Sequence, residues 1–131
     1  MYNSRRKYKN KVIETPDGRF DGKNELQRWL FLKKAENDGI ITDLRRQVEF
    51  TLLPKQTKTK LIHLKTKDKI KDVFAEHPVK YIADFVYNKK GETIVEDFKG
   101  LKTDVYIIKR KMMLFFHGIT IHEVKNPNEA I

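Results

Sequence analysis

Two carboxylates and one lysine interrupt two β-prone runs in the second half of the chain. Asp84 lies within the run YIADFVY, and Asp97 and Lys99 lie at the end of the run ETIVEDFKG. A charged side chain in an apolar run usually costs stability unless it is paired or binds a ligand. Three of them in two adjacent runs indicate a site that combines negative charge with one amine.

The two runs are predicted to pair as a β-hairpin, because Asn88–Gly91 between them is typical of a turn that ends in glycine. We expect a register closed around the two lysines of that turn, which sets Asp84 opposite Val95. Alternate side chains of a strand share a face, so Asp97 then lies diagonal to Asp84, roughly 7–8 Å away at the backbone. Lys99 follows on the same face.

This arrangement suits the hydrolysis of a phosphodiester. Carboxylate oxygens bind hard cations, so we expect Mg²⁺ or Mn²⁺ between Asp84 and Asp97. Such an ion activates water and polarises a phosphate, while Lys99 positions or deprotonates the water or neutralises developing charge. The alternative is a solvated strand face with a weak ion pair. Glu96 points away from Asp97 and is the weaker candidate.

Length and composition predict a single folded domain over residues 1–131. The chain is 39% hydrophobic and 11% aromatic, which is enough for a core. No apolar run approaches the ~20 residues that span a membrane, and the basic N-terminus lacks the apolar region of a secretory signal. Cysteine is absent, which excludes disulfides and thiolate ligands. We expect a cytoplasmic protein.

The net charge of +10 is concentrated in two segments. Residues 1–11 form a basic N-terminal arm with five Lys or Arg and no acid, and residues 55–80 hold eight Lys and three acids. Clustered positive charge indicates a polyanion partner. Neither segment has the Trp of a basic amphipathic anchor, which favours nucleic acid over an anionic membrane. The candidate DNA-contacting residues are Arg5, Arg6, Lys7, Lys58, Lys60, Lys65, Lys67, Lys102 and Lys109.

The remaining elements follow from periodicity and punctuation. A helix is predicted from an N-cap at Asp21 to Asn37, and a strand over residues 47–53. The basic insertion 55–79 follows that strand, with a short helix over residues 70–76. After the hairpin, Thr103 caps a second helix that ends at His117-Gly118.

The second helix carries an apolar stripe of Val105, Ile108, Met112 and Phe115/Phe116, which we expect to face the core. A strand over residues 119–124 and a frayed tail, 125–131, complete the chain. The element order predicts an α/β fold with one mixed sheet flanked by helices.

Glu25 is a conditional member of the site. It lies in the first turns of the first helix, at the edge of the predicted buried stripe. A Glu there interacts favourably with the helix dipole, which is sufficient reason for its presence. It becomes a third ligand only if the helix packs over the face that carries Asp84 and Asp97.

Asp84, followed thirteen residues later by Asp97-Phe98-Lys99, resembles the D…(D/E)-x-K signature of the PD-(D/E)XK nucleases. The segments FDGKNELQRW, YIADFVY and VEDFKGLKT resemble, more closely, a small phage and prophage family of uncharacterised proteins placed in that superfamily. Ala83 stands where the signature has proline. The resemblance implies a restriction-endonuclease-like αβββαβ core, with Glu25, Asp84 and Asp97 as metal ligands and Lys99 as the catalytic lysine.

The resemblance further implies a Mg²⁺- or Mn²⁺-dependent endodeoxyribonuclease of phage type, acting in the host cytoplasm on double-stranded or branched DNA such as a Holliday junction. One site cuts one strand, so duplex cleavage requires a homodimer. The alternatives are a non-catalytic DNA-binding protein and a subunit of a phage recombination or packaging complex. In the latter, the insertion 55–79 would be the docking element.

Overall fold

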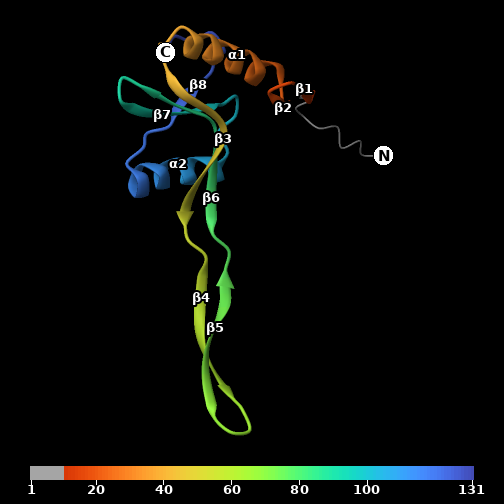
Figure 1. Cartoon of the computed structure of the whole chain (residues 1–131), viewed down its shortest axis with the longest axis vertical. Coiled ribbons are helices and arrows are strands. Elements are labelled where there is room, and N and C mark those ends of the chain that lie inside the picture. The colour runs from red at the N-terminus through yellow and green to blue at the C-terminus, as the bar shows by residue number, and fades with distance from the viewer. Residues whose placement is uncertain (1–10) are drawn as a thin grey trace.

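The computed structural model describes residues 11–131, so the candidates Arg5, Arg6 and Lys7, and nearly all of the N-terminal arm, lie outside the described residues. The described chain forms a three-layered body from which a long two-stranded arm projects (Figure 1). Its elements are β1 (Ile13–Thr15), β2 (Gly18–Phe20), α1 (Lys23–Asn37), β3 (Thr42–Leu53), β4 (Gln56–His63), β5 (Asp68–Glu76), β6 (Val79–Lys89), β7 (Glu92–Phe98), α2 (Asp104–His117) and β8 (His122–Val124).

The body is built on a four-stranded mixed sheet with the order β3-β6-β7-β8. The β3/β6 and β6/β7 pairs are antiparallel, and the β7/β8 pair is parallel. One buried cluster lies under α1 and includes Trp29 and Leu32, and the other lies under α2 and includes Tyr106 and Met113. The prediction of a mixed sheet flanked by helices is therefore confirmed. The short β1/β2 hairpin was not predicted.

The two helices differ in how well their ends were predicted. α2 begins as expected, because the Thr103 hydroxyl accepts a hydrogen bond from the Tyr106 N–H at 3.1 Å, and it ends at Gly118, which has a φ of 66°. The N-cap of α1 is Gly22, which makes no side-chain capping bond, so the assignment of Asp21 was wrong. No helix of the described residues is both long enough and apolar enough to cross a membrane.

The β6/β7 hairpin turns one residue later than predicted, which shifts the pairing of β7 against β6 by two residues. Lys89 pairs with Glu92, and the turn residues Lys90 and Gly91 both have positive φ, 49° and 81°. Two such residues define a type I′ turn, whose twist matches that of the flanking strands. A shift of two residues preserves the faces, because side chains alternate with a period of two. Continuing the observed register sets Asp84 opposite Asp97, in place of Val95.

The basic insertion is a β-ribbon and contains no helix. β4 and β5 pair with each other from Gln56 to the tip at His63 and Asp68, so the short helix predicted over residues 70–76 was wrong. Ile70, Val73 and Phe74 recur at helical spacing, but pairing with β4 decides the conformation. Figure 1 shows the ribbon extending from the end of the β3/β6 pair.

The apolar stripe of α2 does not face the core. Tyr106 and Met113 are buried, whereas Val105, Ile108 and Phe115 are 61%, 57% and 82% exposed. The expectation that the stripe packs inward was therefore wrong for these three side chains and for Phe116, which is 50% exposed. The helix instead presents an apolar face to solvent.

The C-terminal segment, expected to be frayed, is held against α1. Arg28 is fully buried, and its guanidinium donates to both carboxylate oxygens of Glu96, at 2.8 and 2.7 Å, and to the carbonyls of Pro127 and Glu129. Ile131 packs at the edge of the cluster under α1. Burial of a charged group requires such a set of partners, so the tail is part of the structure.

Candidate active site

Asp97 is the most buried carboxylate of the candidate site. It is 2% exposed, at the end of β7, and its Oδ2 accepts a hydrogen bond from the Tyr81 hydroxyl at 2.6 Å. Burial, reinforced by the hydrogen bond and the charge of Asp84, raises the pKa of Asp97 from 3.8 to about 8. The folded protein therefore holds a proton, or requires a positive ion, at this position.

Asp84 lies beside Asp97 and is fixed by the backbone of the neighbouring strand. Its Oδ2 accepts from the Phe98 N–H at 2.9 Å, and its Oδ1 accepts from the Gln47 amide at 3.4 Å. The predicted proximity of the two carboxylates is thus present, in a directly opposed geometry. Two carboxylates this close repel each other unless a proton or a cation is shared between them.

β6 changes face at Asp84. Tyr81 and Ala83 belong to the cluster under α2, while Phe85 and Tyr87 belong to the cluster under α1, although a regular strand would point all four to one side. The β3/β6 register places Gln47 opposite Asp84, and Gln47 has a φ of 51°, which is uncommon for a residue other than glycine.

Asp84 therefore lies at the position where the side chains of β6 change from one face of the sheet to the other, and groups from both faces can reach it. One of these groups is Glu25, which joins the site through Gln47. The Gln47 amide donates to Oε1 of Glu25 at 3.4 Å as well as to Asp84, and Arg46 lies 3.8 Å from the same Glu25 oxygen. Burial and the charge of Asp84 raise the pKa of Glu25 to about 7, against the opposing effect of Arg46. The first helix does pack so that Glu25 borders the carboxylate pair.

Lys99 supplies the positive charge. Its Nζ lies 3.5 Å from Oδ1 of Asp97 and 4.4 Å from the ring centre of Tyr106, and its side chain is 25% exposed. The aromatic face and the carboxylate together restrict the ammonium to one side of the pair. Lys99, Asp84 and Asp97 are thus brought together as the sequence predicted.

Among residues 11–131, no three His, Cys, Asp or Glu side chains come close enough together to hold a metal ion between them. The site offers a pair of carboxylates, with Glu25 one hydrogen-bonded residue away. A pair is a sufficient protein contribution for Mg²⁺, which keeps several waters and takes further ligands from substrate phosphates. The role of Glu25 as a direct ligand stays a prediction.

Glu96 has a structural role on the opposite side of the sheet. It is fully buried and forms the ion pair with Arg28, and the Tyr87 hydroxyl donates to it as well. Its direction away from Asp97 agrees with the prediction. The two adjacent acids of β7 thus have different partners, which makes Glu96 a control for Asp97.

Three residues of the site were not singled out from the sequence. These residues are Gln47, Tyr81 and Arg46, which join the site through hydrogen bonds or an ion pair with Glu25, Asp84 or Asp97. Arg46 lies over the Phe20 ring at 3.6 Å and donates to the carbonyls of Asp17 and Arg19. No local signal marks these residues, since their positions depend on the face change and on the β1/β2 hairpin.

The basic candidates are spread over different parts of the molecule. Lys102 is paired with Glu123 at 3.2 Å, and Lys109 is half-buried on α2. The four arm candidates, Lys58, Lys60, Lys65 and Lys67, are exposed on the ribbon. Within residues 11–131, none of these lysines forms a hydrogen bond or an ion pair with Asp84 or Asp97.

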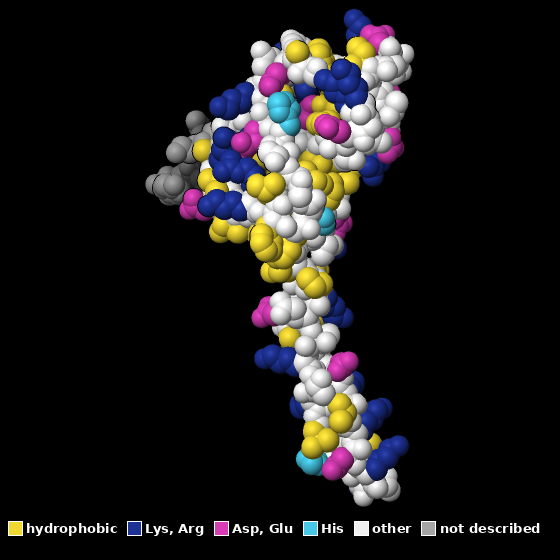
Figure 2. Space-filling view, turned by 90° about the vertical axis from the view of Figure 1, so that its left-hand side faces the viewer, with side chains coloured by type: hydrophobic (Ala, Val, Ile, Leu, Met, Phe, Trp, Pro, Cys, Tyr) yellow, Lys and Arg dark blue, Asp and Glu magenta, His cyan; other side chains and the backbone are white. Residues whose placement is uncertain are grey.

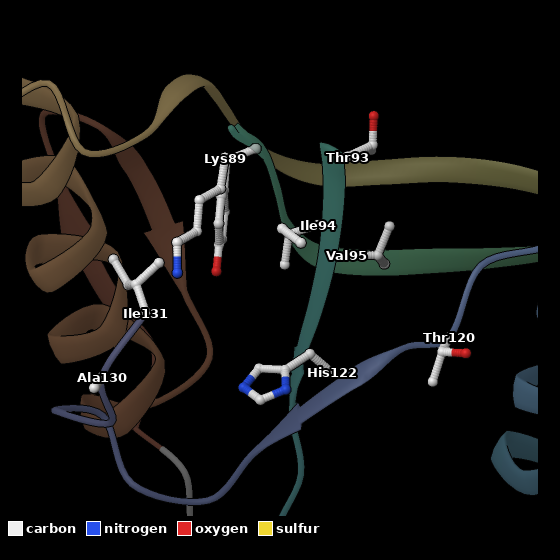
Figure 3. A pocket seen from close by; sticks show the side chains of 9 residues that line it. Lys89, Thr93, Ile94, Val95, Thr120, His122, Ala130 and Ile131 are labelled. Carbon is white, nitrogen blue, oxygen red and sulfur yellow. The ribbon is translucent and has the colours of Figure 1, made fainter. Parts of the chain in front are cut away.

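The pocket shown in Figure 3 is lined by none of the residues of this site. It is an open hollow of about 220 Å³ between β7, β8 and the C-terminal segment, and Ile94, Val95, His122 and Ile131 line it. None of its lining residues is a carboxylate. We assign no chemistry to it.

The fold and the site define an α/β protein with a buried aspartate, Asp97, paired with the half-buried Asp84 beside a lysine. The chain belongs to the family described as "Protein of unknown function (DUF1064)", whose model matches residues 5–126. No curated protein and no solved structure matches the chain. The family covers the whole sheet and the candidate site, and its description names no activity.

Proposed function

We propose that the protein is a metal-dependent endodeoxyribonuclease of the PD-(D/E)XK type with a restriction-endonuclease-like core. The observation that carries the proposal is the convergence of Asp84, Asp97 and Lys99 from two strands, with Lys99 Nζ 3.5 Å from Asp97. A buried carboxylate beside a second carboxylate, as Asp97 is beside Asp84, costs stability when nothing neutralises the pair. A cation that binds the pair and a phosphate together explains why the chain retains it.

The residues fit a hard divalent cation such as Mg²⁺ or Mn²⁺. All donors are oxygens, and the pKa of Asp97 is raised first by burial and then by the hydrogen bond and charge of Asp84, so a cation at the pair would favour its ionised form. Asp84 and Asp97 would hold the ion, and Glu25 would bind it directly or through water. When bound, such an ion supplies an activated water and polarises the phosphate.

The protein groups around the pair have separable roles. Tyr81 donates to Oδ2 of Asp97 and so fixes the carboxylate plane, which leaves Oδ1 on the side of Lys99. The Lys99 ammonium lies where it can orient the attacking water and stabilise the charge that develops on the phosphate. Gln47 keeps Asp84 and Glu25 apart at fixed positions, because it donates to both.

DNA is the proposed substrate because the net charge of +10 favours a polyanion. A chain with one site cuts one strand, so cleavage of both strands of a duplex or symmetric cleavage of a branched junction requires a homodimer. The exposed residues Val105, Ile108 and Phe115 of α2, with Met112 between them, recur at the 3-4-3 spacing of a helix-pairing seam. A second copy of the same helix matches this spacing.

The test is a cleavage panel with single-stranded, duplex, flap and four-way-junction DNA in Mg²⁺, Mn²⁺ or EDTA. We expect Asp84→Asn and Asp97→Asn to abolish cleavage while DNA binding persists. The matched control is Asp43→Asn, because Asp43 is an exposed aspartate whose positive φ of 53° asparagine tolerates well. Cleavage that survives both site substitutions in pure protein would refute the proposal, and so would binding without cleavage of any substrate.

A further inference from the structure

The β4/β5 arm separates its charges by face. In the observed register Lys60 is opposite Lys71, Lys58 is opposite Val73, and Lys69 is opposite Ile62. Paired residues share a face and alternate along each strand. Lys58, Lys60, Lys69 and Lys71 therefore occupy one face of the ribbon, which we call the lysine face.

Two of the three acids of β5, Asp68 and Asp72, lie on the other face, and the third, Glu76, lies at the base of the ribbon opposite Gln56, beyond a register shift. Asp72 is opposite Thr59 and accepts its hydroxyl hydrogen bond at 3.3 Å, and Asp68 is opposite His63, 2.9 Å from the imidazole Nδ1. In the described part of the chain, no ion pair includes any of the four lysines. Figure 2 shows the dark blue side chains along the length of the arm, all of them Lys in this segment, with magenta acids among them. From the Lys58/Val73 pair to the Ile62/Lys69 pair, the lysine face therefore carries only positive charge.

This arrangement disfavours the arm on its own. Like charges directly opposite each other, as at Lys60 and Lys71, destabilise an antiparallel pair. An isolated two-stranded ribbon is also marginally stable in water. A strip of negative charge along the lysine face would remove the repulsion.

The spacing of the lysines matches a nucleic acid backbone. Lys58 and Lys60, and likewise Lys69 and Lys71, are two residues apart, or roughly 6.6–6.8 Å along a strand. Two nucleotides of one strand of B-DNA rise about 6.8 Å along the axis. The major groove, about 12 Å wide, admits a two-stranded ribbon. The eight residues of β4 span about 27 Å, which is about eight base pairs.

We propose that the lysine face binds the phosphates of a duplex that extends beyond the cleaved bond. This proposal describes the substrate of the site and so rests on the proposed nuclease function, because the DNA would be cleaved next to Asp84 and Asp97. Lys69 and Lys71 thus join Lys58 and Lys60 as phosphate contacts, while Lys65 and Lys67 lie at the tip of the arm, where the Leu64 N–H donates to the Lys67 carbonyl. The substrate then requires about eight base pairs on the side of the arm.

The test measures the salt dependence of binding to a fluorescein-labelled duplex of about 30 base pairs in EDTA, where cleavage does not interfere. The test variant replaces all four lysines of the lysine face by glutamine. The control replaces four exposed lysines of the body by glutamine, so that the two proteins carry equal net charge: Lys23, Lys34, Lys111 and Lys125.

Each phosphate contact contributes about 0.9 to the slope of log affinity against log salt. We expect the slope of the test variant to fall by about 3–4 and that of the control by less than about 1. Between about 50 and 200 mM salt, the loss of affinity of the wild-type protein then exceeds that of the test variant on the order of 100-fold. Circular dichroism checks folding. A second variant deletes residues 54–78 and joins Leu53 to Val79, which are paired in the sheet, through an Asn-Gly turn. Its slope of log affinity against log salt should fall by the same amount as that of the test variant.

Equal slopes for the test variant and the control would overturn the inference. It would also be overturned if the test variant lost binding to phosphatidylserine vesicles while its DNA slope stayed unchanged, because the strip would then serve a membrane. A reduced slope in a protein that cleaves no substrate would support the arm and refute the proposed nuclease. Cleavage with unchanged slopes would do the reverse.

Discussion

Replacement of Asp97 by asparagine should stabilise the metal-free protein while it removes the proposed activity. The introduced amide keeps an oxygen that accepts from Tyr81, and its NH₂ group can donate to Asp84. The substitution therefore preserves the shape of the site and removes one of its two neighbouring negative charges. Stability and cleavage are expected to change in opposite directions, which is a signature of a site selected for ligand binding.

The magnitude follows from the pKa of Asp97, which is raised from 3.8 to about 8. The folded state holds the proton of the Asp97 carboxyl more tightly than the unfolded state does. The contribution of this proton to the free energy of unfolding is therefore fully present below about pH 4 and is lost as the pH rises to about 8. A shift of about four pKa units corresponds to a ceiling on the order of 5 kcal/mol. An amide also leaves one hydrogen-bonding group less well satisfied, so we expect a gain of about 1–3 kcal/mol at about pH 8.5.

Thermal unfolding in EDTA at several pH values measures this effect. A gain of this size raises Tm by about 3–10 °C at about pH 8.5, and the difference should vanish toward about pH 4. Glu96→Gln is the matched control, since it neutralises the adjacent acid and deprives the buried Arg28 of its partner, so it should destabilise the protein. Destabilisation by Asp97→Asn at the alkaline pH, or a gain independent of pH, would refute the reasoning.

Three further predictions address other parts of the molecule. Arg28→Met should lower the free energy of unfolding by about 3–5 kcal/mol in urea titrations, and adding Glu96→Leu should recover most of the loss; an additive double variant would contradict this. Lys99→Ala should reduce cleavage at least about 100-fold, within the range for general acid–base groups, with Tm almost unchanged; a large drop in Tm would assign Lys99 to the fold. Ile108→Ser with Phe115→Ser should halve the mass measured by light scattering; an unchanged mass would exclude the α2 seam.

The parts of the site that the sequence predicts are those that depend on alternation along one hairpin. Asp84, Asp97 and Lys99 were expected on one side of the sheet, and an error of two residues in the register leaves that side unchanged. Thr103 and Gly118 similarly set the ends of α2 through local capping chemistry. These signals are contained within a few neighbouring residues.

The remaining parts depend on contacts between distant segments. Gln47 reaches the site because β3 and β6 change face together, and Tyr81 bonds to Asp97 for the same reason. Arg28 has no local sign of burial, since its partners are 68 or more residues away in the chain. α2 is apolar on more than one side, so its periodicity could not decide between Met113 and Phe115 as the buried residue.

The arm and the β3/β6 strand pair of the sheet form one hairpin in the order of the chain. Lys60 pairs with Lys71 and Val48 pairs with Ala83, which continues the same register across breaks at Pro54–Lys55 and His77–Pro78. Contacts of low sequence separation form quickly because their loops are short. Pairing that begins at the tip would therefore bring β3 and β6 together step by step. The projecting arm can in this way speed up, during folding, the β3/β6 pairing that positions Gln47 and Asp84.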